Sequence, residues 1–272
     1  MRVMKTIFAV TAAVFLFVTP DAEAREISTQ DLEDLPKAQV IFLGEVHDNP
    51  AHHNNQRTAL EALHPKAVVY EMLTPEMAAK VTPEASLDED VLEELLNWAE
   101  SGWPDFAMYF PLFKVTSAAE VYGAQVSRNA AREAVMGGDV AAVFGPDAAD
   151  FGLTNALPED LQAEREAKQL AAHCDALPVE MLPGMVLAQR LRDATLARAA
   201  TEALAATGGP VAVITGNGHA RTDWGTAALM PEGVTVLSVG QFEAAPEGAQ
   251  PFDLWVVTEP AERDDPCAAF SK

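Results

Sequence analysis

The stretch VIFLGEVHDNP, residues 40–50, decides the fold. Its first four residues are a short, continuous apolar run that ends at Gly44, which is typical of a buried strand. Asn49 and Pro50 follow as a helix cap and a first helical residue, and they predict a helix that ends near His64. The stretch AVVYE, residues 67–71, predicts a second strand. Strand, helix and strand in this order predict a βαβ unit with parallel strands.

Outside this unit, the chain continues the same pattern of strands and helices. A helical stretch follows between residues 74 and 122. In it, Ser86 and Glu89 predict a capping box that opens an acidic helix, and Trp103 to Phe110 is expected to be irregular. A long helix is expected over 185–206, and further strands over 123–127, 211–214, 234–239 and 254–257. We therefore expect one α/β domain over 25–272, a central, largely parallel sheet with flanking helices and a helical insertion.

The first 24 residues have the pattern of a cleaved export signal. Arg2 and Lys5 precede an apolar run over 7–18, and Ala22-Glu23-Ala24 is a small-residue cleavage site. A run of about a dozen residues is shorter than the roughly 20 that cross a bilayer. We expect a periplasmic chain that starts at Arg25 and has no stable membrane insertion. An uncleaved anchor is the alternative.

The net charge limits the classes of binding partner, and the cysteine content predicts a disulfide. The formal net charge of −23 repels phosphate backbones and anionic lipid surfaces, so nucleic acid is not an expected partner. The two cysteines, Cys174 and Cys267, lie in no C-x-x-C motif. In an oxidising compartment such an isolated pair favours a disulfide, and two separate thiols are the alternative.

Three predicted strands end in polar side chains. Glu45 and His47 follow the first strand, Glu71 follows the second, and His219 follows the strand near residue 214. Parallel strands bring these ends to one edge of the sheet, where ligands bind in open α/β folds. Two imidazoles and two carboxylates can hold a divalent metal or divide general acid and base roles. The structural alternative is that they only pair with one another or cap helices.

The neighbouring helices add polar side chains. His52 and Gln56 lie four residues apart and are expected to form a polar wall of the pocket, whereas His53 is expected to be exposed. Gln189 and Asp193 have the same spacing, which fits either a buried network or exposed salt bridges. Serine-hydrolase, nucleotide-binding and H-E-x-x-H zinc motifs do not occur in the sequence.

Several of these stretches together resemble the ChaN family of iron-regulated, haem-binding proteins. They are GEVHDNP (44–50) with His53 and Gln56, YEM (70–72), QRLRDA (189–194) and GNGHAR (216–221). The ChaN family is part of a superfamily with the Tiki and TraB proteins and the erythromycin esterases, some of which are metal-dependent proteases or hydrolases. The resemblance implies an α/β fold and haem at a surface pocket, shared by two subunits of a homodimer. This chain lacks the lipidation cysteine of many members.

The resemblance makes haem binding in haem or iron uptake the first functional hypothesis, with an outer-membrane haem transport system as partner. In the family the iron is held by tyrosine with histidine nearby, and tyrosine is a known haem ligand. Of the three tyrosines, Tyr109 is assigned as the ligand. The residues assigned around the haem are His53, Gln56, Gln189 and Arg221. The second hypothesis is a metal-dependent hydrolase or protease that uses Glu45, His47, Glu71 and His219; a partner-binding scaffold is a third.

Overall fold

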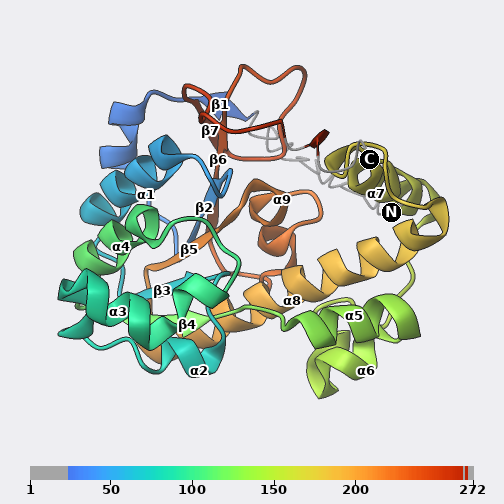
Figure 1. The fold of residues 1–272 in the computed structure, drawn as a ribbon, viewed down its shortest axis with the longest axis horizontal. Helices are drawn as coiled ribbons and strands as arrows, with labels where there is room; N and C mark the ends of the chain where they lie inside the picture. Colours follow the sequence, from blue (N-terminus) through green and yellow to red (C-terminus); the bar gives the residue numbers. More distant parts are fainter. Residues whose placement is uncertain (1–23, 266, 269–272) are drawn as a thin grey trace, which may run out of the picture.

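The computed structural model describes residues 24–265, 267 and 268, so residues 1–23 of the leader expected over 1–24 lie outside the described residues. At its centre is a seven-stranded sheet with the order β1-β7-β6-β2-β5-β3-β4, in which all neighbouring strands are parallel (Figure 1). The predicted α/β class is confirmed. The strands are β1 (Arg25–Glu26), β2 (Val40–Glu45), β3 (Ala67–Tyr70), β4 (Glu120–Gly123), β5 (Val211–Gly216), β6 (Val236–Phe242) and β7 (Leu254–Val257).

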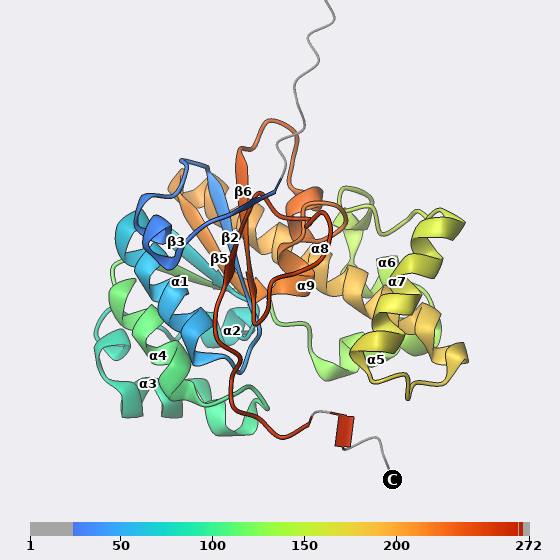
Figure 2. The ribbon, with the colours of Figure 1, turned by 90° about the horizontal axis from the view of Figure 1, so that it is seen from above.

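Helices cover both faces of the sheet, as Figure 2 shows: α1 and α4 lie on one side and the long α8 crosses the other. The α-helices are α1 (Pro50–Leu63), α2 (Pro75–Ala78), α3 (Glu89–Leu96), α4 (Phe106–Val115), α5 (Arg128–Gly137), α6 (Val140–Phe144), α7 (Glu159–Ala172), α8 (Leu182–Thr207) and α9 (Asn217–Ala220). Short 3-10 helices are η1 (Thr29–Asp34), η2 (Ala85–Leu87), η3 (Trp98–Glu100), η4 (Pro146–Ala149), η5 (Val179–Met181) and η6 (Thr226–Leu229).

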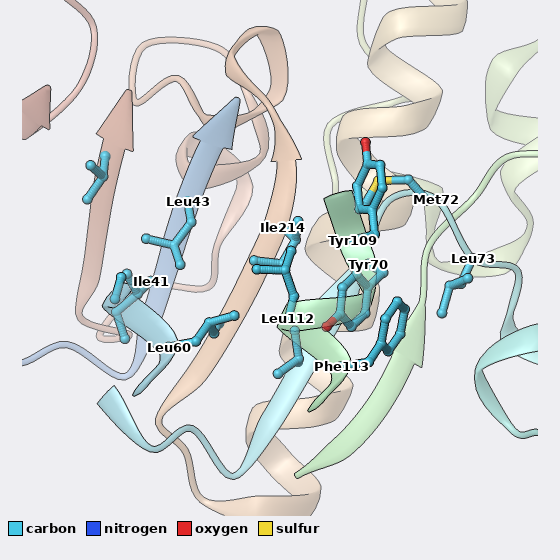
Figure 3. Packing of buried hydrophobic residues seen from close by; sticks show 14 of the residues in the cluster. Ile41, Leu43, Leu60, Tyr70, Met72, Leu73, Tyr109, Leu112, Phe113 and Ile214 are labelled. Atoms are coloured by element: carbon cyan, nitrogen blue, oxygen red, sulfur yellow. The ribbon is translucent and has the colours of Figure 1, made fainter. Parts of the chain in front are cut away.

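The core follows from the alternation of side chains along the buried strands. On β2, Ile41 and Leu43 face the α1 and α4 side, whereas Val40 and Phe42 face α8. Aromatic side chains fill the first layer: Tyr70 of β3 stacks on Phe113 of α4 with ring centroids 4.3 Å apart, and Tyr109 is buried beside them (Figure 3). Such strands, which are apolar on both faces, are typical of a parallel sheet that helices cover on both sides.

A helical insertion separates β4 from the second half of the sheet. Helices α5, α6 and α7 all pack against α8 rather than against the sheet. They enclose a small core of their own that includes Val140, Phe144, Leu153 and Leu191. Helix α8 is therefore buried by the sheet in its second half and by the insertion in its first half. This arrangement confirms the helical part expected from the sequence.

Three local predictions are wrong. The strand expected over 123–127 is β4, which ends at Gly123 because its partner β3 ends at Tyr70. The acidic helix begins at Glu89, since the Asp88 carboxylate, and not Ser86, accepts from the first turn. The segment expected to be irregular enters α4 at Phe106, where Asp105 accepts a hydrogen bond from the Ala107 amide.

The cysteine pairing and the hydropathy of the helices can be compared with the sequence predictions. Cys174 and Cys267 form a disulfide, which confirms the predicted pairing. Among the described residues, no helix combines the length and apolar character needed to cross a membrane.

Candidate functional site

The parallel register brings the predicted polar strand ends together. Glu45, the last residue of β2, lies beside Gly216, the last residue of β5. Glu71 directly follows β3, and its backbone amide donates to the Ile214 carbonyl of β5. His47 follows β2, and His219 lies in α9 directly after β5. We call these four side chains, Glu45, His47, Glu71 and His219, the strand-end cluster.

Glu45 is the buried centre of the first half of this cluster. Its Oε1 lies 2.7 Å from His47 Nδ1 and accepts from the Tyr109 hydroxyl at 3.0 Å, while Oε2 accepts from Gln56 Nε2 at 2.7 Å. Burial alone would raise the pKa of Glu45, but the bond with His47 and the charges of His53 and His47 outweigh it and lower the pKa. The carboxylate is therefore ionised.

His47 is the open member of the first half. Its side chain is 34% exposed, whereas that of Glu45 is fully buried. Burial would lower the pKa of His47, but the bond to Glu45 and the charges of Glu71, Glu45 and Asp48 raise it to about 9. The ring of Trp103 packs edge-on against the imidazole with centroids 4.9 Å apart. Nδ1 is therefore held by Glu45, and the ring is held between a carboxylate and an indole.

The second half of the cluster is a buried chain of charges. His219 Nδ1 lies 2.7 Å from Asp193 Oδ1 on α8, and its Nε2 lies 3.5 Å from Glu71 Oε1. The other oxygen of Asp193 pairs with Arg165 of α7 at 3.2 Å. Burial would lower the pKa of His219, but the charge of Glu71 and the bond with Asp193 raise it. His219 thus lies between two carboxylates, which favour its protonated form.

Glu71 is fixed by the backbone and side chain of β5. Its Oε2 accepts from Thr215 Oγ1 at 2.6 Å and from the Gly216 amide at 2.9 Å. Burial would raise the pKa of Glu71, but the charges of His219 and His47 and these hydrogen bonds lower it to about 2. Glu71 therefore interacts with both imidazoles and joins the two halves electrostatically.

The helix α1 histidines lie beneath the cluster and not on its surface. His53 is 2% exposed, so the expectation that it is exposed is wrong; one ring nitrogen, Nε2, donates to the His47 carbonyl at 2.8 Å. His52 is fully buried, and its Nδ1 accepts from the Val46 amide. Desolvation lowers the pKa of His52 to about 4, which keeps it neutral. Together with Gln56, these buried side chains hold the turn after β2, and none of them lines the pocket beside the cluster that is described below.

Two further predicted residues lie in different places. Gln189 of α8 places its Nε2 3.2 Å from His219 Nδ1, so it belongs to the second half of the cluster. Arg221 pairs with Asp223 and lies over the Trp224 ring at 3.9 Å. The structure therefore joins Gln189 to the strand-end cluster and places Arg221 with a separate group of residues.

The metal hypothesis does not fit the observed arrangement. Within residues 24–265, 267 and 268, no three His, Cys, Asp or Glu side chains are grouped so that they could hold a metal ion. His219 has a carboxylate at each ring nitrogen, Asp193 at 2.7 Å and Glu71 at 3.5 Å, so of the two imidazoles only His47 has a ring nitrogen left for a ligand. Glu45, His47, Glu71 and His219 form two ion-paired sets, and nothing observed favours the metal-dependent hydrolase.

Two side chains that were not predicted as site residues, Gln241 and Asn217, also shape the site. Gln241 of β6 donates to the carbonyls of Gly44 and His52, and Asn217 bonds the backbone of Gln241 on both sides. A Cβ at Gly44 would meet the Asn217 side chain and the Val239 carbonyl. Only glycine fits there. The stretch that begins at Gly44 therefore packs directly against the stretch that contains Asn217. An amide inside a strand, as at Gln241, was the available signal.

A small pocket opens beside the cluster. It has a volume of about 220 Å³ and is lined by Glu71, Trp103, Arg128, Arg192 and neighbouring residues of the 101–103 and 124–126 loops. Arg128 and Arg192 give this opening positive charge in a strongly acidic chain. Its volume is below the roughly 300–1,000 Å³ of pockets that enclose a small-molecule ligand. The pocket can therefore hold only part of a large ligand.

Of three similar solved structures, the first shares this fold. The structure described as cofacial haem binding to ChaN of Campylobacter jejuni is 18% identical, with 83% of this chain and 89% of that chain covered and a TM-score of 0.58. The type III effector HopBA1 is 13% identical, with 85% and 92% covered and a TM-score of 0.45. A Bacillus cereus protein is also 13% identical, with 88% and 76% covered and a TM-score of 0.34. No significant match was found among curated proteins.

A match of the sequence to a family model shows which family the chain belongs to. The family model described as "Haem-binding uptake, Tiki superfamily, ChaN" matches residues 32–230, which is 199 of the 272 residues and includes the whole strand-end cluster. Since the match covers most of the chain, this protein belongs to the ChaN family of the Tiki superfamily.

Proposed function

We propose that this chain is an exported haem-binding protein that takes part in haem or iron uptake in the periplasm. The family description supports haem as the ligand, and so does the similarity to the Campylobacter jejuni ChaN, a protein described as binding haem cofacially. The leader pattern of residues 1–24 and the Cys174–Cys267 disulfide support export, because disulfides persist in oxidising compartments. An outer-membrane haem transport system is the partner that such a role requires.

The tyrosine assignment does not fit the structure. Tyr109 is fully buried, and its hydroxyl donates to Glu45. Burial and the Glu45 carboxylate raise the pKa of Tyr109 well above its usual range, which opposes the phenolate form that binds iron. Tyr70 is buried in the same core, and Tyr122 donates to Glu120 at the start of β4, away from the strand-end cluster. We therefore do not retain Tyr109 as the haem ligand.

The observation that carries the proposal is the state of His47. Nδ1 is bonded to Glu45, while Nε2 has no hydrogen-bond partner within the described part of the chain. A buried Nε2 without a partner would be shut off from water, and Nε2 of His47 is not such an atom. Solvent therefore reaches it. A carboxylate bonded to the second ring nitrogen orients metal-ligating histidines and makes them more basic. His47 would hold the haem iron through Nε2 in its neutral form, releasing on binding the proton that its raised pKa keeps on the ring, since imidazole is an established haem ligand.

The charge and size of the neighbouring pocket fit this assignment. Arg128 and Arg192 would pair with the propionates, because guanidinium groups bind carboxylates through two hydrogen bonds. Trp103, already packed on His47, offers an aromatic surface beside the ligand. A pocket of about 220 Å³ covers only part of a haem. A second copy of the chain would cover the remainder, which supports the proposed homodimer.

Haemin titration of the purified mature protein tests the proposal. We expect a saturable, shifted Soret band that is lost, or weakened at least about tenfold, in His47→Asn. The matched control is His64→Asn, which removes an exposed imidazole from the end of α1 and keeps a residue that tolerates the left-handed backbone there. Tyr109→Phe should bind haemin like the wild type. Loss in Tyr109→Phe together with normal binding in His47→Asn would restore the tyrosine assignment instead.

A further inference from the structure

Cations gather around the indole of Trp224, which lies in the chain between α9 and η6. The Trp224 ring lies 3.9 Å from the Arg221 guanidinium, 5.4 Å from Lys168 Nζ and 5.7 Å from the Arg165 guanidinium. Arg190 of α8 is near enough to Arg165 for their charges to interact. The chain as a whole carries 41 acidic and 18 basic residues, so a local excess of cations is an exception that needs an explanation.

Only half of these cations are paired with carboxylates. Arg221 pairs with Asp223 and Arg165 with Asp193. Within the described ranges, Arg190 and Lys168 make no ion pair. Arg190 donates only from Nη2, to the carbonyls of Gly152 and Asn155 at 2.7 and 2.8 Å. Desolvation and the charge of Arg165 lower the pKa of Arg190, and the Asp193 carboxylate offsets them only in part.

A pocket opens between these cations and an apolar wall. Its volume is about 280 Å³, roughly that of nine water molecules in the liquid. The polar part is formed by Arg165, Arg190, Asp193, Asp223 and Trp224. The rest is mainly apolar and consists of Phe151, Gly152, Leu153, Leu157, Leu161, Ala228 and Leu229. It shares no residue with the pocket beside the strand-end cluster.

We propose that this Trp224 pocket binds a small organic carboxylate with an apolar body. Among the described residues, Nε and Nη1 of Arg190 have no hydrogen-bond partner, and this guanidinium receives the carboxylate, while the leucine and phenylalanine wall receives the apolar part. The volume suits a molecule of about ten non-hydrogen atoms. A neutral apolar molecule would leave Arg190 without an ion-pair partner, and an inorganic anion would leave the apolar wall in contact with water.

Calorimetric titration of the mature protein with octanoate is the direct test. We expect saturable binding, at least about tenfold tighter than that of octanol or inorganic phosphate. In the two-dimensional NMR spectrum, octanoate should move the indole signal of Trp224, which Trp224→Phe identifies by its absence. Octanol binding as tightly as octanoate would show a merely apolar cavity and overturn the proposal. Equal binding of phosphate, or no octanoate binding, would overturn it too.

Charge variants locate the site. Arg190→Gln should weaken octanoate binding at least about tenfold, because the charge-assisted bonds are lost. Lys168→Gln, at an exposed position of α7 without an ion pair, keeps the test valid if the first variant does not fold; we expect a weakening of about threefold. Arg57→Gln removes the same charge from α1 and should leave binding unchanged. Equal effects of Arg57→Gln and Lys168→Gln would indicate a non-specific charge effect and reject the pocket.

Discussion

The two halves of the strand-end cluster use the same chemistry in different surroundings. Each pairs an imidazole Nδ1 with a carboxylate at 2.7 Å. In the Glu45 half, the His47 side chain is 34% exposed and its second nitrogen is reached by solvent. In the Asp193 half, the His219 side chain is 8% exposed, and its second nitrogen faces Glu71 at 3.5 Å. Only one of the two imidazoles is open to a ligand.

This difference separates a ligand-facing group from a structural one. Removing one partner of a buried ion pair strongly destabilises the fold, because the remaining charge is left uncompensated. His219, Asp193 and Arg165 form such a set, tying α7, α8 and the end of β5 together. His47 instead combines a fixed Nδ1 with a reachable Nε2. Substitutions in the two halves should therefore differ in whether they affect stability or ligand binding.

The largest effect is expected for Asp193→Ala. Removing this carboxylate leaves Arg165, which is 6% exposed, as a buried cation without its ion-pair partner and leaves His219 with Glu71 alone. The free energy of unfolding should fall by about 3–5 kcal/mol. Urea denaturation monitored by circular dichroism measures it. Glu61→Ala, which removes the exposed partner of Arg57 on α1, is the control and should cost only about 0.3–0.5 kcal/mol. Similar losses in both variants would show that the buried half is not a coupled set.

This same residue shows how far the sequence predicts the site. Strand-end glutamates and histidines were predicted because parallel strands share an edge, and the register of β2 with β5 brings them together. Asp193 was recognised only as a neighbour of Gln189 at helical spacing. Its partner Arg165 lies in α7, within a segment that has no clear periodicity. Which helix packs on which depends on long-range contacts, and spacing alone does not contain them.

Tyr109 shows a second property that the sequence did not predict, the burial of a single side chain. The family resemblance selects a tyrosine, and the aromatic segment around it was expected to be irregular. In the structure this segment becomes α4, whose apolar face packs on the sheet, and burial in that layer decides what the hydroxyl can do. The fold class followed from local patterns, whereas burial of a single side chain follows from tertiary packing.

Tyr109→Phe should have the next largest effect on stability. It removes a buried hydrogen bond to an ionised carboxylate and keeps the ring that packs, so the free energy of unfolding should fall by about 1.5–3 kcal/mol. Tyr122→Phe is the matched control, since its hydroxyl donates to an exposed glutamate, Glu120, and should cost under about 1 kcal/mol. If Tyr109→Phe proves no costlier than the control, the Glu45 half is held together by packing alone.

The pH dependence of His47 comes third. The folded pKa of about 9 lies above the unfolded value of about 6.5, so its pairing stabilises the protein fully below pH 6.5. This stability is lost as the pH rises towards 9, by about 1 kcal/mol after allowance for screening at a partly exposed group. Urea denaturation at pH 6 and pH 9.5 should show this loss in the wild type and a smaller one in His47→Gln. NMR titration of the imidazole should give a midpoint near 9; a midpoint near 6.5 would contradict the pairing.

The smallest effect on stability, and the most selective effect on the two halves, is expected for Gly216→Ala. Gly216 has φ of −63°, which alanine adopts without strain, so the free energy of unfolding should change by less than about 1 kcal/mol. The new Cβ would lie 2.9 Å from His47 Nε2, and because this is the end of a side chain, the imidazole can turn away. The NMR signals of the His47 ring should therefore shift while those of His219 stay close to their wild-type positions. Haemin binding should weaken if Nε2 is the ligand. Shifts of equal size at both imidazoles would mean that the two halves respond as one unit through Glu71.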